Sequence, residues 1–216
     1  MLRLALCLCV LSSAARACET ALLLAMDVSN SVDAAEYRIQ TDGLALALRD
    51  PSIAEIVLRD RVALAVLQWS GPDRQELSLG WLQPGDAAGL AALAARVETM
   101  PRAFLLSDTA PGAALMAALD VFATAPDCKR RIIDMSGDGT PNAGSNPAAA
   151  RVRAERMGVT VNGLAIEAQG AGLPVTNFYR RSLATRDGFV MTARSHRSYA
   201  ETLRAKMLRE LSRVLG

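Results

Sequence analysis

Oxygen-bearing side chains alternate at Asp27, Ser29 and Ser31, directly after the apolar run Ala21–Met26. The run predicts a buried strand that ends where this cluster begins. Because alternate side chains of an extended or turning segment point the same way, the three can converge on one point. Three oxygen ligands without nitrogen or sulfur favour a hard cation such as Mg²⁺. The competing interpretation is that Ser29 or Ser31 caps a helix that begins at Val32.

Strands and helices must position these side chains, and their patterns alternate along the chain. Apolar runs predict strands at 21–26, 61–69, 132–136, 159–166 and 188–192, with an edge strand at 75–79. Helical patterns cover 32–49, 86–99, 111–123, 147–157 and 199–214. This alternation is typical of an α/β fold, a doubly wound, mostly parallel central sheet flanked by helices. In such a sheet a ligand binds beyond the carboxyl ends of the strands, where the strand order reverses.

The Asp-x-Ser-x-Ser pattern at 27–31 resembles the first element of the metal-ion-dependent adhesion site (MIDAS) of von Willebrand factor type A domains. Thr109, in Ser-Asp-Thr-Ala-Pro-Gly, is similar to the loop threonine of that site. Asp138, in Asp-Met-Ser-Gly-Asp-Gly, resembles the aspartate at the end of the fourth strand, and Asp134 is the alternative carboxylate. The resemblance covers residues 21–214. It implies a Mg²⁺ or Mn²⁺ ion held by Asp27, Ser29, Ser31, Thr109 and Asp138.

A closer resemblance is to an exported bacterial family of type A-like proteins that is classed as a domain of unknown function. Its hallmarks match Cys18, the Asp-Val-Ser-x-Ser-Val-Asp stretch at 27–33, the segment 128–139 and a closing helix with Lys206 and Glu210. Asn30 stands where that family more often has glycine, which leaves the metal ligands untouched. The resemblance implies a fold and a metal site but no activity.

The ligand set of the family site implies a binding function. The hydroxyls are neutral and the aspartates act largely through metal-bound waters, so the ion keeps much of its positive charge. One position is left open, and a carboxylate from an Asp or Glu of a partner protein is the expected occupant. We therefore expect an adhesion or assembly module. The alternative is a type A-like scaffold with a vestigial metal site.

The sequence gives little support to an enzyme. Haloacid-dehalogenase-type phosphatases need a second carboxylate two residues after the nucleophile, where this chain has Ser29. An acid is also missing near Asn142 and Ala143. Glycine-rich nucleotide loops and a Gly-x-Ser-x-Gly turn are absent. The single histidine, His196, precedes the last helix, where we expect a structural or solvated side chain.

Composition limits the remaining classes. With 216 residues, 51% hydrophobic and 21% charged, the chain is suited to one α/β domain. Its 24 basic residues are spread among 22 acidic ones, so no nucleic-acid partner is expected. After the N-terminal segment, the chain has no uninterrupted apolar stretch of roughly 18 to 20 residues, so no membrane span is predicted.

The first 17 residues are typical of a cleaved signal peptide. A positive start at Arg3 precedes the apolar run 4–15, and Ala-Arg-Ala at 15–17 is the small-x-small pattern of a cleavage site. The chain thus divides into a signal peptide, 1–17, and a type A-like domain, 18–216, in the periplasm or secreted. A lipid-modified Cys18 is the alternative, to which Arg16 fits poorly.

Cleavage would remove Cys7 and Cys9 and leave Cys18 and Cys128, an even pair in an oxidising compartment. The pair predicts a disulfide, with two free buried thiols as the alternative. In a type A-like sheet the first and fourth strands are parallel neighbours. Each cysteine lies shortly before one of these strands, so the resemblance places both at the sheet edge opposite the metal site.

Overall fold

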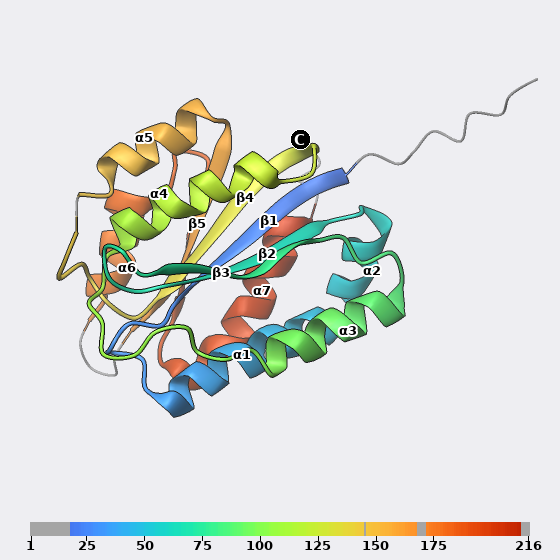
Figure 1. Ribbon diagram of the computed structural model, residues 1–216, viewed down its shortest axis with the longest axis horizontal. Helices are drawn as coiled ribbons and strands as arrows, with labels where there is room; N and C mark the ends of the chain where they lie inside the picture. The colour runs from blue at the N-terminus through green and yellow to red at the C-terminus, as the bar shows by residue number, and fades with distance from the viewer. Residues whose placement is uncertain (1–17, 145, 168–171, 213–216) are drawn as a thin grey trace, which may run out of the picture.

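The computed structural model describes residues 18–144, 146–167 and 172–212, and the expected signal peptide lies outside these ranges. A six-stranded sheet forms the middle layer, in the order β3-β2-β1-β4-β5-β6 (Figure 1). The strands are β1 (Cys18–Asp27), β2 (Ala63–Trp69), β3 (Gln75–Leu82), β4 (Cys128–Gly137), β5 (Val159–Ile166) and β6 (Val190–Ala193). All neighbours run parallel except β2 and β3, which confirms the predicted doubly wound α/β class.

Helices cover both faces of the sheet (Figure 1). One face carries α1 (Ala34–Arg49), α2 (Pro51–Arg59), α3 (Ala87–Glu98) and α7 (Tyr199–Leu211). The other carries α4 (Pro111–Val121), α5 (Ala148–Arg156), α6 (Pro174–Phe178) and the π-helical turn η2 (Tyr179–Leu183). Two 3₁₀ turns, η1 (Phe122–Thr124) and η3 (His196–Ser198), complete the described elements. Among these helices, none combines the length and apolarity that crossing a membrane demands.

The central strand β1 divides the core into two halves. Leu22, Leu24 and Met26 contact the cluster under α1, α2, α3 and α7. Leu23 and Ala25 alternate with them and contact the cluster under α4 and α5. All five are at most 4% exposed. Because both faces of β1 are covered, the strand reads as a continuous apolar run rather than an alternating one.

Most predicted elements recur with shifted ends, and two segments were missed. Strand β5 has the predicted bounds, whereas β1 and β4 begin earlier, at the two cysteines. The separate helix α2 was not predicted, although Asp50 caps it by accepting from the backbone N–H groups of Ser52 and Ile53. Helix α6 and the turn η2 were also missed, because five-residue elements carry no readable period.

A disulfide joins Cys18 to Cys128, which face each other in the register of β1 and β4, with their Cα atoms 4.5 Å apart. The bond closes a loop with a sequence separation of 110 residues. Constraining so long a loop in the unfolded chain stabilises the fold by about 4 kcal/mol. Since both cysteines begin their strands, the bond lies at the amino edge of the sheet.

Buried charges attach α7 to the sheet. The Nζ atom of Lys206 lies 2.7 Å from Oδ1 of Asp134 on β4 and also contacts Glu210 one turn along the helix. Asn162 of β5 donates to Oε1 of Glu210 at 2.8 Å. These side chains are almost fully buried. Asp134 therefore contacts α7, which leaves Asp138 as the carboxylate from the end of β4 that is available to the candidate metal site.

Candidate metal centre

The loop after β1 presents its serines toward the carboxyl end of the sheet. Asp27 is fully buried, and its Oδ1 accepts from the backbone N–H of Ser29 at 2.8 Å. Neither serine caps α1. Asp33 does so, in a capping box with Glu36. The hydroxyls of Ser29 and Ser31 are thus available for another role, and the capping interpretation is wrong.

Four oxygen atoms from three distant segments lie side by side at this edge. The Ser29 hydroxyl is 3.2 Å from that of Ser31 and accepts from the Thr109 hydroxyl at 3.0 Å. The Ser31 hydroxyl donates to Oδ1 of Asp138 at 2.6 Å. Neighbouring ligands of an octahedral Mg²⁺ ion are about 2.9 Å apart, given metal–oxygen distances of about 2.0–2.1 Å. The spacing of the hydroxyls fits such an ion.

The topology explains why these residues meet. The chain forms β1, β2 and β3 on one side and then returns to place β4 on the other side of β1. The order therefore reverses between β1, which ends at Asp27, and β4, which is followed by Asp138. This is the position at which doubly wound sheets bind ligands. The structure brings the five predicted site residues together there, while their role as ligands stays a prediction.

Two polar side chains that the sequence analysis did not select hold the site in shape. The guanidinium of Arg102 donates to the carbonyl oxygens of Val28 and Ser29, each at 2.9 Å. Asn142 accepts from the backbone N–H of Thr109 at 2.8 Å and donates its own N–H back to the Thr109 carbonyl at 3.1 Å. No local sequence pattern predicts either contact. In the sequence, Asn142 stood out only as a position where a phosphatase would have an acid.

The electrostatics of the site favour a cation. Burial, and then the nearby charge of Asp138, raise the pKa of Asp27 to about 7. Burial also raises the pKa of Asp138. Among the described residues, Oδ2 of Asp27 has no hydrogen-bond partner. An orphaned carboxylate oxygen beside a second acid and three hydroxyls is suited to a hard divalent ion, so the residues fit the metal that the resemblance implies.

Gly137 allows the side chains of Tyr179 and Asp27 to pack closely against the backbone beneath the site. A Cβ atom at Gly137 would lie 2.6 Å from the Tyr179 hydroxyl and 2.7 Å from Oδ2 of Asp27. Tyr179 is fully buried on η2, and burial next to the site carboxylates holds its pKa well above the usual range. The sequence analysis missed Tyr179. Its position depends on a π-helical turn that has no sequence signature here.

The structure distinguishes between the two expectations for His196, a structural or a solvated side chain. This side chain is only 15% exposed, and its Nδ1 lies 2.9 Å from Oε1 of Glu36. Its Nε2 lies 3.9 Å from Oδ2 of Asp138. The sole histidine is therefore next to the candidate metal centre, because the segment after β6 returns to the carboxyl edge of the sheet.

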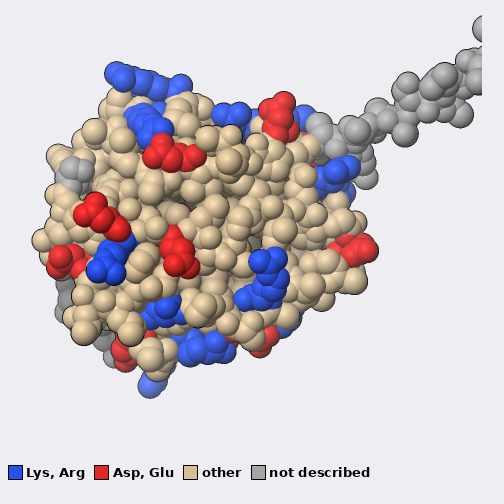
Figure 2. All heavy atoms as spheres, viewed as in Figure 1, with Lys and Arg blue, Asp and Glu red and all other residues tan. Residues whose placement is uncertain are grey.

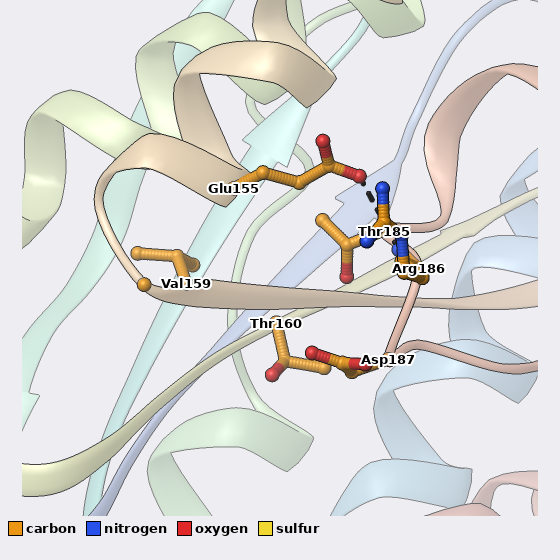
Figure 3. A pocket seen from close by; sticks show the side chains of 7 residues that line it. Glu155, Val159, Thr160, Thr185, Arg186 and Asp187 are labelled. Atoms are coloured by element: carbon orange, nitrogen blue, oxygen red, sulfur yellow. Dashed lines mark hydrogen bonds between the residues drawn. The ribbon is translucent and has the colours of Figure 1, made fainter.

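Away from the candidate metal centre, a pocket of about 330 Å³ lies at the amino end of β5, near Val159 and Thr160 (Figure 3). The polar side chains that line this pocket form hydrogen bonds to the backbone, which stabilise the fold. Glu155 accepts from the backbone N–H of Arg186, and the Thr185 hydroxyl accepts from that of Val161. On the face drawn in Figure 2, basic and acidic residues are interspersed. The candidate centre at the carboxyl edge remains the place where polar groups converge.

The fold is that of a von Willebrand factor type A domain. Proximal thread matrix protein 1 of the mussel byssus superposes with a TM-score of 0.67 at 17% identity, over 88% of this chain and 47% of that one. A von Willebrand factor type A protein of Catenulispora acidiphila gives 0.63 at 18%, over 90% and 43%. Hypothetical protein BatB of Bacteroides thetaiotaomicron gives 0.60 at 17%, over 89% and 98%.

Residues 17–215 match the family described as "Protein of unknown function (DUF1194)", and the chain belongs to this family. No curated protein matches the sequence. The chain spans less than half of the mussel and Catenulispora proteins. A further structure of the mussel protein is described as having a zinc-occupied MIDAS motif.

Proposed function

We propose that this chain is an exported, metal-dependent protein-binding module. In this proposal Asp27, Ser29, Ser31, Thr109 and Asp138 hold a Mg²⁺ or Mn²⁺ ion, and the ion captures an Asp or Glu carboxylate of a partner protein. The chain carries out no catalysis. The observation that carries the proposal is the cluster of three hydroxyls beside a buried, partly unpaired carboxylate at the switch point of the sheet.

The metal would supply the positive charge that attracts the partner's carboxylate. Neutral hydroxyl ligands leave most of that charge uncompensated, which favours an anionic oxygen at an open position. The mussel protein with a zinc-occupied MIDAS motif supports metal binding in this fold. A pilus adhesin of Lactobacillus rhamnosus, which matches 90% of this chain at 14% identity with a TM-score of 0.61, supports a binding function.

An apolar loop beside the site narrows the chemistry of the partner. Leu105 and Leu106 are 69% and 89% exposed. The next residue, Ser107, accepts from the backbone N–H of Asn30 through its carbonyl oxygen at 3.0 Å and from that of Gly71 through its hydroxyl. The loop is thus attached to the segment that carries Ser29 and Ser31. A partner that places apolar side chains next to its carboxylate fits both features.

The proposal is tested by affinity capture from periplasmic extract, with Mg²⁺ or with a chelator. We expect specific partners to be lost in chelator and with Ser29→Ala, whereas Ser52→Ala, the same change at an exposed position of α2, retains them. Partners that bind Ser29→Ala as well as the unchanged protein would favour the vestigial-site alternative.

Calorimetry tests the metal itself. We expect one Mg²⁺ or Mn²⁺ ion per chain and no binding by Ser29→Ala, with both proteins melting cooperatively. A folded chain that binds no divalent ion at millimolar concentration contradicts the proposal. Hydrolysis of an aryl phosphate, lost in Asp27→Ala, would instead support the phosphatase class.

A further inference from the structure

A pocket of about 630 Å³ lies beside the candidate metal centre. Its lining includes three acids and one guanidinium, from Glu36, Asp138, Glu167 and Arg197, together with His196. These residues come from α1, from the ends of β4 and β5, and from the turn η3 that precedes α7. The excess of acids gives the pocket a negative character, which favours a cation.

The imidazole of His196 is held in one orientation. Its Nδ1 lies 2.9 Å from Oε1 of Glu36, within reach for donating a hydrogen bond, while the other oxygen of Glu36 accepts from the backbone N–H of Asp33. Glu36 is therefore fixed at both oxygens. A proton on Nδ1 leaves the lone pair on Nε2, which is the arrangement of a histidine that binds a metal and is oriented by a carboxylate.

The Nε2 atom of His196 is buried and has no hydrogen-bond partner among the described residues. It lies 3.9 Å from Oδ2 of Asp138, too far for a hydrogen bond. Two ligands of a tetrahedral ion at about 2.0–2.2 Å lie about 3.4 Å apart, so zinc would draw these atoms together by about 0.5 Å. The possible ligand atoms of Glu36, Asp138 and His196 all lie within 4.8 Å of one another.

A second buried acid, Glu167, also favours a cation in this pocket. Glu167 is only 3% exposed and lines this pocket. Its Oε1 accepts from the backbone N–H of Thr176 at 2.7 Å, but within the described ranges its Oε2 has no hydrogen-bond partner. A buried carboxylate oxygen without a donor is costly unless a cation compensates it. The pocket thus holds two unpaired, buried atoms that accept positive charge.

We propose that this pocket binds a second divalent cation, one that accepts nitrogen as well as oxygen ligands, such as Zn²⁺. His196 Nε2 and Asp138 Oδ2 are its protein ligands, Glu36 positions the imidazole, and Glu167 adds negative charge. The preference for Zn²⁺ over Mg²⁺ follows from the imidazole, which suits zinc and not magnesium.

Asp138 connects the second site to the first. Its Oδ1 accepts from the Ser31 hydroxyl, and its Oδ2 faces His196. Each oxygen thus serves one site. The second site uses Asp138, which the proposed function also needs, but none of the three hydroxyls. The two sites are therefore separable by mutation.

The chain contains one histidine, so its imidazole nitrogen resonances report on this pocket alone in untagged protein. We expect Zn²⁺ to move the Nε2 resonance away from the position of a free unprotonated nitrogen, while Nδ1 keeps its proton. Mg²⁺ should leave Nε2 unchanged. An Nε2 signal that stays constant at saturating Zn²⁺, or a histidine protonated on both nitrogens throughout, overturns the proposal.

Two variants separate the sites by zinc stoichiometry. His196→Asn can keep a donor near the Nδ1 position and removes the Nε2 ligand, so it should lose one zinc equivalent and retain Mg²⁺ binding. Ser29→Ala should lose Mg²⁺ and keep the histidine response to Zn²⁺. If the histidine of Ser29→Ala still responds to Zn²⁺, the second site is supported even if the proposed Mg²⁺ site is refuted. Equal zinc stoichiometry in His196→Asn and the unchanged protein contradicts the second site.

Discussion

Among single residues, Asp27 carries the clearest conflict between stability and binding. Its carboxylate is fully buried and one oxygen is unpaired, a situation that a fold tolerates when a ligand compensates it. The Ser29 N–H satisfies only Oδ1. The same side chain that the metal needs should therefore destabilise the metal-free protein.

We predict that Asp27→Asn stabilises the metal-free protein and abolishes stabilisation by Mg²⁺. Asparagine keeps an oxygen for the Ser29 N–H and removes the buried charge. The free energy of unfolding at neutral pH should rise by on the order of 1 kcal/mol or more, since each unit of pKa shift corresponds to about 1.4 kcal/mol. Chemical denaturation with and without Mg²⁺ measures both effects. A variant less stable than the metal-free parent, or one that Mg²⁺ still stabilises, contradicts this account.

Leu106 shows a second conflict between stability and binding. It is 89% exposed and adopts a φ of 50°, in the left-handed region that favours glycine. An exposed leucine in a strained conformation next to the metal loop is suited to contact a partner. We predict that Leu106→Gly raises the free energy of unfolding by up to about 1 kcal/mol and weakens partner capture.

Arg61 supplies the matched control for Leu106→Gly. Its φ is 52°, and it lies in the turn before β2, at the amino edge of the sheet. Arg61→Gly should stabilise the protein to a similar extent and leave capture unchanged. Denaturation and capture assays on both variants distinguish relief of strain from loss of a contact. Capture that is equally strong in both variants would remove the loop from the proposed interface.

Among helices and strands, the sequence predicted those features that local hydrophobic periodicity determines. The apolar run before Asp27 marks a strand tip because both faces of β1 are covered. The hydroxyls of Ser29 and Ser31 then lie 3.2 Å apart, as the alternation predicts. Thr109 and Asp138 required the family resemblance, because no periodicity connects them to Asp27. Contacts that depend on chain return, such as Arg102 to Ser29 at a separation of 73 residues, left no signal.

The docking of α7 on β4 should make stability depend on pH. Burial, and then the charge of Asp134, raise the pKa of Glu210 from 4.5 to about 7. Between these values the folded chain retains a proton that the unfolded chain has lost. Stability should therefore fall as the pH rises from about 4.5 to about 7 and level off above.

We predict that Glu210→Gln reduces this fall, because glutamine mimics the protonated acid beside Lys206 and Asn162. Asp27 contributes a dependence of the same sign in metal-free protein, so the comparison is made in the Asp27→Asn background. Unfolding free energies at intervals between pH 4 and 8 provide the measurement. Parallel curves with and without Glu210→Gln would show that Glu210 does not titrate in this range.

For the molecule as a whole, β1 and β4 connect two features at opposite edges of the sheet. Their amino ends carry the disulfide, and their carboxyl ends carry the candidate metal site. The bond fixes the register of the two strands between which the strand order reverses. Reduction should then loosen the relative placement of Ser31 and Asp138 as well as lower the stability.

The last prediction concerns export and the disulfide together. Cleavage after Ala17 would make Cys18 the first residue, and its bond to Cys128 would hold the new N-terminus against β4. We expect the exported protein to have the mass of residues 18–216 less two hydrogens, with no acyl group. The bonded sulfur cannot carry a lipid. Because the bond constrains the unfolded chain, Cys128→Ser should lower the free energy of unfolding by about 4 kcal/mol. Intact mass spectrometry and denaturation provide the readouts. Two alkylatable thiols in the unreduced, denatured protein would contradict the disulfide, and a diacylglycerol on Cys18 would make the protein membrane-anchored instead.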